Sequence, residues 1–316
     1  MIPVVLSLAA KAIQGPGEGA MDAKHVLGID AGGSHCRARL VDAAGAVLGE
    51  GRAGPANFRL GAETAQDAVL AASHQALAAA GLDETIWPGT AVGLGMAGIE
   101  RRGARAALMA RSWPFARLAL ASDAEIAHWG AHQGGAGGTL IVGTGSVAIM
   151  TLAQRSRRWG GYGFPASDQG SAADLGLAAL RHALLAHDGL AALDGLAAAV
   201  LDRFGGEIAA IIAFQDQASA TDYAALAPLV TAQAQAGDAG ARAIMQAAAE
   251  ALARMLEAMA QAGAERLVLL GGLGVSIKPW LAQACGAALA EPLGDALAGA
   301  LMLARGAAPP ALAEPA

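Results

Sequence analysis

Three glycine-rich turns and two aspartates are the residues of this sequence best suited to chemistry. The most informative turn is GIDAGGS at 28–34, which joins two apolar runs. Because glycine permits φ > 0 and close backbone approach, the N–H groups of Gly32 and Gly33 can point at phosphate oxygens, and Ser34 adds a hydroxyl. A carboxylate that ends a buried strand needs a partner, and Asp30 can hold Mg²⁺ directly or through water. The alternative interpretation is an ordinary tight hairpin.

The second aspartate, Asp123, follows the apolar run Arg117–Ala121 and precedes a predicted helix over 124–133. Its position suits an N-cap, whose side chain accepts a hydrogen bond from the first helical turn. It equally suits a general base that takes the proton from a substrate hydroxyl as that hydroxyl attacks phosphorus. The two roles are compatible, and the local pattern does not choose between them.

Two further turns and one irregular segment could bind the rest of a nucleotide and a sugar. GTGS at 143–146 combines glycines and hydroxyl side chains as the first turn does, but it has no aspartate. GGLG at 271–274 lies between a predicted strand and a predicted helix. Bare backbone at the latter turn can let an adenine or a ribose lie flat against it. The segment WGGYGFPASDQGS at 159–171 combines glycines, aromatic rings and a carboxylate, as sugar-binding loops do. Each of the three also has a structural interpretation as a turn or a capped loop.

The predicted elements place these residues at the ends of strands. Apolar runs predict strands over His25–Ile29, Cys36–Val41, Ala46–Gly49, Ala91–Met96, Arg117–Ala121 and Arg266–Leu270, and a strand-rich unit over 139–159. Helical spacing predicts helices over Ala62–Ala80, Glu100–Ala110, Ala124–Gln133 and Asp295–Arg305, and an almost entirely helical stretch over 171–263 with one helix capped by Asp238. This alternation predicts an α/β fold in which each half opens with a strand–turn–strand unit. Two such hairpins facing each other would clamp a polyphosphate.

The composition excludes several classes of function. The chain has 316 residues, of which 43 are glycine and only 15% are charged, with a net charge of −6. Binding to nucleic acid is disfavoured because it needs a basic face. The longest uncharged run, between His132 and Arg155, is rich in Gly, Thr and Ser and predicts a hairpin, not a membrane-spanning helix. We therefore expect small-molecule ligands, with no nucleic acid and no membrane.

The cysteines and the N-terminus indicate a cytoplasmic protein. Cys36 and Cys285 match no metal motif and are expected to be buried thiols in a reducing cytosol. The first ten residues are apolar but lack the basic start of a secretory signal. We expect residues 1–23 to be a disordered extension, with the first domain beginning at Lys24.

In this order, the motifs resemble the amino-sugar kinase branch of the actin/hexokinase/Hsp70-like ATPases, which comprises N-acetylglucosamine kinase and the related BadF/BadG-type ATPases. The likeness extends from Lys24 to Arg305. It is carried by GIDAGGS at 28–34, Asn57 in GPANF, Ser122-Asp123, GTGS at 143–146, GGYG at 160–163, DQGSA at 168–172, AQAGD at 234–238 and GGLGVS at 271–276. Each motif is weak alone, and their common order is fairly specific.

The resemblance implies two ribonuclease-H-like domains around a central nucleotide and sugar cleft, usually in a homodimer. The N-terminal domain would cover 24–121, with the helix over 295–305 a candidate to pack back on it, and the C-terminal domain 122–294 with a helical insertion. The implied activity is transfer of the γ-phosphoryl group of ATP, with Mg²⁺, to the 6-hydroxyl of an amino sugar.

The resemblance also implies roles for individual residues. Asp123 would be the base on the sugar hydroxyl, and Asp30 would organise Mg²⁺. The nucleotide would contact Asp30, Gly32, Gly33, Ser34, Thr144, Gly145, Ala234, Gly271, Gly272 and Ser276. The sugar would contact Asn57, Asp123, Ser146, Gly161, Tyr162, Gly163 and Asp168. Gln169 and Val147 depart from the family pattern near the 2-substituent, so glucosamine competes with N-acetylglucosamine as the substrate.

Two other functions fit parts of the pattern. A dehydratase-activator ATPase of the same broad group would need two cysteines per subunit to bridge an iron–sulfur cluster, and Cys36 and Cys285 are not placed for that. A sugar-sensing regulator would usually carry a helix-turn-helix, for which residues 1–24 are too few. The kinase is the favoured interpretation.

Overall fold

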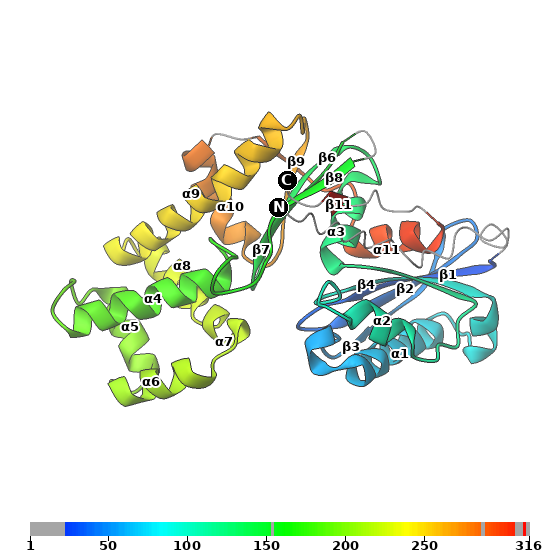
Figure 1. Cartoon of the computed structure of the whole chain (residues 1–316), viewed down its shortest axis with the longest axis horizontal. Helices are drawn as coiled ribbons and strands as arrows, with labels where there is room; N and C mark the ends of the chain where they lie inside the picture. Colours follow the sequence, from blue (N-terminus) through cyan, green and yellow to red (C-terminus); the bar gives the residue numbers. More distant parts are fainter. Residues whose placement is uncertain (1–22, 153–154, 286–287, 307–311, 314–316) are drawn as a thin grey trace, which may run out of the picture. The chain divides into compact units, whose positions relative to one another are not determined.

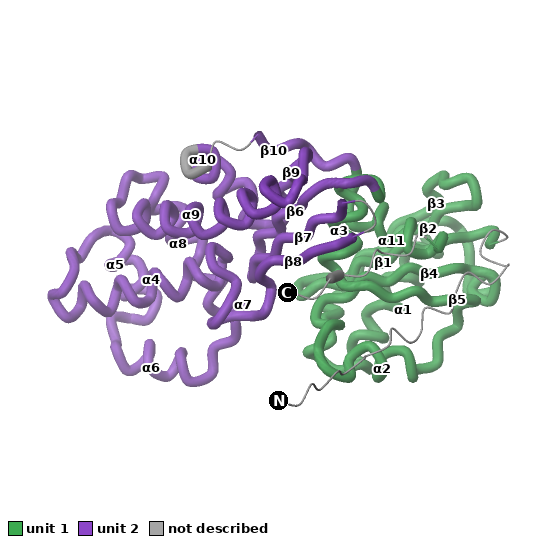
Figure 2. The backbone as a smooth tube through the Cα atoms, turned by 45° about the horizontal axis from the view of Figure 1, so that its top comes forward, with its two compact units in different colours: residues 1–134, 294–309 green, residues 135–293, 310–316 purple. Residues whose placement is uncertain are grey.

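The computed structural model describes residues 23–152, 155–285, 288–306 and 312–313. Apart from Ala23, the predicted N-terminal extension lies outside this part of the chain. The protein divides into two compact units, unit 1 (1–134 and 294–309) and unit 2 (135–293 and 310–316), coloured separately in Figure 2. The compact units divide after residue 134, which is 13 residues beyond the boundary predicted after residue 121. Helix α3 (Asp123–His132) belongs to unit 1 because it packs on α11 (Ala296–Ala304), which returns to unit 1 as the sequence suggested.

Unit 1 is built on a five-stranded mixed sheet with the order β3-β2-β1-β4-β5. The strands are β1 His25–Ala31, β2 Cys36–Asp42, β3 Val47–Ala53, β4 Thr90–Met96 and β5 Arg117–Ala121. Strands β1, β2 and β3 form an antiparallel meander, whereas β1, β4 and β5 are parallel. The carboxyl ends of the three parallel strands therefore meet at one edge of the sheet.

Helices cover both faces of this sheet (Figure 1). Helices α1 (Ala62–Ala79) and α2 (Ala104–Met109) bury the apolar side chains of one face, among them Ile29, Leu40 and Leu94. Helices α3 and α11 cover the other face, where glycines replace large side chains. A Cβ on Gly93 would lie 2.0 Å from the carbonyl oxygen of Ala300, and one on Gly95 would lie 2.2 Å from Cδ1 of Ile126. Bare backbone thus lets α3 and α11 pack directly on the sheet.

Unit 2 contains a six-stranded mixed sheet with the order β10-β9-β6-β7-β8-β11. Its strands are β6 Gly137–Val142, β7 Ser146–Leu152, β8 Arg155–Gly160, β9 Leu267–Leu270, β10 Leu289–Ala290 and β11 Leu312–Ala313. Strands β6, β7 and β8 form an antiparallel meander, and β9 pairs with β6 in parallel. Both units thus open with the strand–turn–strand architecture that the sequence predicted.

The helical stretch predicted over 171–263 is confirmed. It contains α4 Ala172–His187, α5 Gly195–Arg203, α6 Ile208–Gln217, α7 Ala220–Ala224, α8 Ala227–Gln235 and α9 Ala239–Gln261, and α10 Gly274–Cys285 follows β9. The side chain of Asp238 accepts a hydrogen bond from the N–H of Ala241 and begins α9 as expected. Leu252, Leu256 and Met259 then bury one stripe of α9 in the core of unit 2.

Two predicted elements differ from the structure by more than two residues at one end. The helix expected over Glu100–Ala110 begins only at Ala104, because residues 100–103 form turns that end with Gly103 at φ 78°. The third strand continues to Ala53 and is longer than the sequence predicted. Short 3-10 helices over Phe58–Leu60 and Glu84–Gly89 complete unit 1.

Cys36 is buried, as predicted for a structural thiol. Burial raises its pKa to about 12, and the negative charge of Asp30 acts in the same direction. The prediction for Cys285 concerns a side chain outside the described part of the chain. Within that part, none of the helices combines the length and the apolar character needed to cross a membrane.

Candidate functional site

Asp30 and Asp123 lie at the same edge of the unit 1 sheet. In the strand register, Asp30 of β1 stands beside Gly95 of β4, which stands beside Ala121 of β5. Asp123 follows Ala121 by two residues and is the first residue of α3. Since Gly95 has no side chain, Ile126 of α3 packs against it, and this contact fixes the start of the helix over the sheet. The two aspartates predicted from the sequence therefore share one environment.

Asp123 does not cap α3, contrary to one of its two predicted roles. Ser122 is the N-cap: its hydroxyl accepts a hydrogen bond from the N–H of Glu125, and the Glu125 carboxylate accepts one from the N–H of Ser122. This reciprocal capping box satisfies the first turn of the helix. The Asp123 carboxylate accepts a local hydrogen bond from the N–H of Ala124, at 3.0 Å. Its side chain is therefore released from the capping role.

The surroundings of Asp123 favour its protonated form. Burial raises its pKa to about 6, and the negative charges of Asp30 and Glu100 act in the same direction. The hydrogen bond from the N–H of Ala124 opposes this rise. A carboxylate with a pKa near the working pH is a more effective general base than an ordinary aspartate.

The β1–β2 hairpin places its glycines and Asn57 side by side. The N–H of Gly32 donates to the carbonyl of His35 at 3.1 Å and closes the turn, while Gly33 and Ser34 are exposed. A Cβ on Gly33 would lie 3.9 Å from Nδ2 of Asn57. On its other side, Asn57 lies against Gly98, where φ is 78° and a Cβ would approach Oδ1 of Asn57 to 2.8 Å. Unit 1 thus brings together all of its residues for which the sequence predicted a role.

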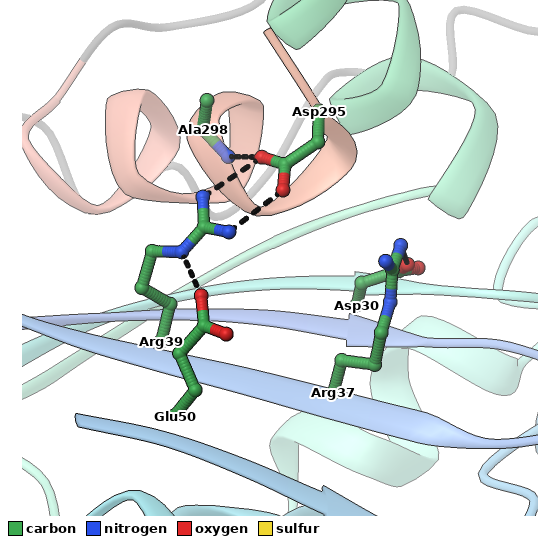
Figure 3. Close-up of polar contacts among 6 residues, drawn as sticks. All are labelled: Asp30, Arg37, Arg39, Glu50, Asp295 and Ala298. Carbon is green, nitrogen blue, oxygen red and sulfur yellow. Dashed lines mark hydrogen bonds and ion pairs between the residues drawn. The ribbon is translucent and has the colours of Figure 1, made fainter. Parts of the chain in front are cut away.

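The sequence reasoning missed Arg37. It stands opposite Asp30 in the antiparallel β1–β2 ladder, and its Nη2 lies 2.6 Å from Oδ2 of Asp30 (Figure 3). Counting across the predicted turn would have paired these two residues. The negative charge of Asp30 therefore has a cationic partner on the neighbouring strand.

In unit 2, the GTGS turn joins β6 to β7 and lies against the first turn of α4. The N–H groups of Ala172 and Ala173 donate to the carbonyls of Gly143 and Thr144, at 2.9 and 3.2 Å. Gly145 faces Asp168, because a Cβ at this position would lie 2.7 Å from Oδ2 of that carboxylate. The turn and Asp168, which the sequence assigned to nucleotide and sugar, are thus neighbours.

Ser146 and Asp168 are buried, whereas Tyr162 is exposed. The Ser146 hydroxyl donates to the carbonyl of Gln169 at 2.8 Å, so it holds the loop that contains Asp168. Asp168 itself is buried and has φ 69°, a conformation that few non-glycine residues adopt. Gly161 and Gly163 also have positive φ, at 73° and 103°, and flank the 60% exposed Tyr162.

A shallow groove of about 390 Å³ lies beside this loop. Tyr162, Ser167 and Gln169 line one part of it, and Trp159 and Arg254 line another. Aromatic rings beside polar groups suit a sugar, which has apolar C–H faces as well as hydroxyls.

The GGLG turn packs on the end of β6. The N–H of Leu273 donates to the carbonyl of Val142 at 3.1 Å, and a Cβ on Gly271 would lie 2.2 Å from that oxygen. Gly272 has open space around its Cα, and Ser276 lies in the first turn of α10. The side chain of Ala234, by contrast, is buried in the core from α8. The structure therefore brings the second and third glycine turns together at β6.

The residues of unit 1 fit Mg²⁺ bound in company with phosphates. No group of three or more His, Cys, Asp or Glu side chains in the described part of the chain could hold a metal alone. Mg²⁺ does not require such a cage, since it is commonly held by one or two carboxylates, several waters and the phosphates of a substrate. Asp30 supplies a carboxylate at the base of the glycine turn and suits this mode of binding.

Comparison with known proteins gives the family. Residues 27–301 match the family model described as the BadF/BadG/BcrA/BcrD ATPase family. The chain belongs to this family. It is 37% identical over 280 residues to glucosamine kinase GspK of Vibrio cholerae, an alignment that covers 89% of this chain and 95% of that protein. The likeness to amino-sugar kinases predicted from the sequence is confirmed.

Solved structures of kinases have the same fold. A protein from Chromobacterium violaceum, provisionally named an N-acetylglucosamine kinase, matches with a TM-score of 0.83 and 32% identity over 89% of this chain and 99% of its own. A glucokinase of the ROK family from Streptomyces griseus matches with a TM-score of 0.53 and 18% identity over 89% and 98% of the two chains. The predicted actin/hexokinase-type fold is therefore confirmed.

Proposed function

We propose that this protein is an ATP-dependent amino-sugar kinase that phosphorylates the 6-hydroxyl of glucosamine or N-acetylglucosamine. The observation that carries the proposal is the state of Asp123. This carboxylate is relieved of helix capping by Ser122, has a pKa raised to about 6, and lies at the sheet edge beside Asp30. The similarity to glucosamine kinase GspK and to the provisionally named N-acetylglucosamine kinase supports the substrate class.

In the proposed reaction, Asp123 accepts the proton of the sugar hydroxyl. The hydroxyl oxygen forms a bond to the γ-phosphorus of ATP, the bond from that phosphorus to the bridging oxygen breaks, and ADP leaves with the electron pair. Phosphoryl transfer depends mainly on positioning and on charge stabilisation. The N–H group of Gly33 and the hydroxyl of Ser34, both on exposed residues, would orient the phosphates, and Gly32, whose N–H donates to the carbonyl of His35, would shape the turn. Mg²⁺, held by Asp30 and phosphate oxygens, would neutralise charge on the phosphates when bound.

We assign the remaining predicted residues by unit. In unit 1, Asn57 would bind a sugar hydroxyl. In unit 2, Asp168 and the loop over 161–163 would bind sugar hydroxyls, Thr144 and Gly145 would contact phosphate, and the turn over 271–274 with Ser276 would flank the adenosine. Ser146 would act by holding the Asp168 loop, since its hydroxyl is already bonded to Gln169. For Ala234, which is buried, we retain only a backbone role beside the adenosine.

We also propose that the enzyme is a cytoplasmic homodimer, as the family resemblance implies. Light scattering coupled to size-exclusion chromatography tests the assembly. The competing function of a dehydratase activator is disfavoured by Cys36, because its burial and a pKa near 12 oppose the thiolate that an iron–sulfur cluster needs.

The decisive experiment is a coupled ADP-release assay with glucosamine, N-acetylglucosamine, N-acetylmannosamine and glucose. We expect turnover with one or both of the first two sugars, and no ADP release with any of the four would refute the kinase. Asp123→Asn should lower kcat by about 10²- to 10⁴-fold while ADP still binds. Asp67→Asn, a change of the same kind at an exposed position of α1, should leave kcat unchanged.

A further inference from the structure

Arg37 lies at the base of the β1–β2 hairpin and has unused hydrogen-bonding capacity. One nitrogen of its guanidinium, Nη2, contacts Asp30 at 2.6 Å. A second, Nε, is buried and has no hydrogen-bond partner among the described residues. The side chain as a whole remains 38% exposed. Because a guanidinium offers five N–H donors, Arg37 can bind a further acceptor without leaving the hairpin.

Arg39, two residues along the same strand, shows the contrast. Its Nε donates to Glu50, and its Nη1 and Nη2 donate to the two carboxylate oxygens of Asp295, at 2.9 and 2.8 Å. Figure 3 shows this guanidinium between the carboxylates of Glu50 and Asp295, while the guanidinium of Arg37 lies against Asp30. Arg39 therefore has a structural role, and the spare donors on this face belong to Arg37.

The position of Arg37 favours phosphate as the further acceptor. Asp30 and Arg37 face each other where β1 and β2 join the glycine turn, so the guanidinium lies at the base of the turn proposed to hold phosphates. An unpaired Asp30 would repel a polyphosphate, and Arg37 balances that charge. Guanidinium groups bind carboxylates and phosphates through the same planar pairs of N–H donors. The guanidinium of Arg37, which binds the Asp30 carboxylate, can therefore bind a phosphate with little change in its position.

We propose that Arg37 is a nucleotide-binding residue, which neutralises Asp30 in the empty protein and donates to phosphate oxygens when ATP or ADP binds. This inference rests on the proposed function, because it assumes that the β1–β2 hairpin receives a nucleotide. Arg37 lies outside the glycine turns, and its guanidinium would contact the phosphates directly, without a metal ion between them.

Isothermal titration of ADP in the presence of EDTA tests the role of Arg37 separately from that of any metal. Arg37→Ala should weaken ADP binding about 10- to 100-fold, the range expected for loss of a charge-assisted hydrogen bond. Arg37→Lys should recover part of the lost ADP affinity, because lysine keeps the positive charge but lacks the planar pair of N–H donors of a guanidinium. Arg52→Ala is the matched control: Arg52 stands beside Arg37 on β3, one strand further from Asp30, and its loss should change ADP affinity less than twofold.

Titration of adenosine separates a phosphate contact from a change in folding. Adenosine lacks phosphate, so its affinity should be equal in the wild-type protein and in Arg37→Ala. The proposal is overturned if Arg37→Ala and Arg52→Ala bind ADP equally, or if Arg37→Ala loses adenosine and ADP to the same degree. If the wild-type protein binds neither ligand in EDTA but turns over in the ADP-release assay with Mg²⁺, this inference fails alone. If it also shows no turnover, the proposed kinase function fails with it.

Discussion

Asp30 and Asp123 interact unfavourably across the carboxyl edge of the unit 1 sheet, where the charge of Asp30 adds to burial in raising the pKa of Asp123 to about 6. The strand register through Gly95 and Ala121 sets the positions of the two aspartates along the sheet edge. The packing of Ile126 on Gly95 holds the start of α3, and with it Asp123, against the sheet. Two carboxylates with separated roles result, one suited to a cation and one suited to a proton.

The pH dependence of catalysis should report the state of Asp123. A base acts only when ionised, so kcat/KM should fall as pH decreases through about 6. Glu100 contributes to the raised pKa through its charge, so Glu100→Gln should move the acidic limb of the profile to lower pH. Steady-state rates between pH 5 and 8 test this. An unchanged limb in Glu100→Gln would mean that the limb does not belong to Asp123.

The same raised pKa should make Asp123 a source of instability above its pKa. The folded protein binds this proton more tightly than the unfolded chain, whose aspartate titrates near 3.9, so the stability contributed by protonated Asp123 is lost as pH rises from about 4 to about 6. Asp123→Asn cannot ionise and should increase the free energy of unfolding by up to about 3 kcal/mol at pH 7.5. Urea unfolding at pH 7.5 and pH 4 checks the prediction. The gain should disappear at pH 4, and a gain that persists there would assign it to another cause.

Features encoded by neighbouring residues were predictable from the sequence. The strand before each glycine turn, the cap of α9 at Asp238 and the start of α11 after Asp295 depend on local periodicity and on side-chain to backbone hydrogen bonds. The capping box of Ser122 and Glu125 was also present as a local signal, at the spacing that defines this motif. Its recognition would have excluded the capping role of Asp123 in advance.

Features that depend on partners distant in sequence were not predictable. The assignment of α3 to unit 1 depends on glycines of β4 and on α11, more than 150 residues further along the chain. The raised pKa of Asp123 depends on burial and on the charges of Asp30 and Glu100, which come close to Asp123 only when the chain folds. Residue types and spacing identify the aspartates, whereas their electrostatic coupling requires the fold.

Asp295 should stabilise unit 1 through two separable contacts. One carboxylate oxygen accepts the N–H of Ala298 and caps α11, and both oxygens bind Arg39 (Figure 3). Asp295→Asn retains a capping side chain but loses the ion pair, which is partly exposed, so we expect a loss of stability below about 1 kcal/mol. Asp295→Ala loses both contacts and should lose about 1 kcal/mol more. Equal losses in urea unfolding of the two variants would contradict a capping contribution.

Gly145 and Gly143 provide a matched pair for testing the sugar site of unit 2. Both lie in the GTGS turn and neither has the positive φ that strains other residues. A Cβ on Gly145 would lie 2.7 Å from Oδ2 of Asp168, whereas one on Gly143 would meet no atom within 4 Å. Gly145→Ala must therefore displace the carboxylate proposed to bind the sugar, and Gly143→Ala should not.

We expect Gly145→Ala to raise the KM for the sugar about tenfold or more, because displacement of a binding group by a fraction of an ångström disturbs its hydrogen bonds. Gly143→Ala should retain the KM of the wild-type enzyme, and both variants should show similar thermal unfolding. Steady-state kinetics with the sugar and ATP varied in turn distinguishes the two ligands. A larger effect of Gly145→Ala on the KM for ATP than on the KM for the sugar would mean that the proposed contact of Gly145 with phosphate outweighs its effect on Asp168.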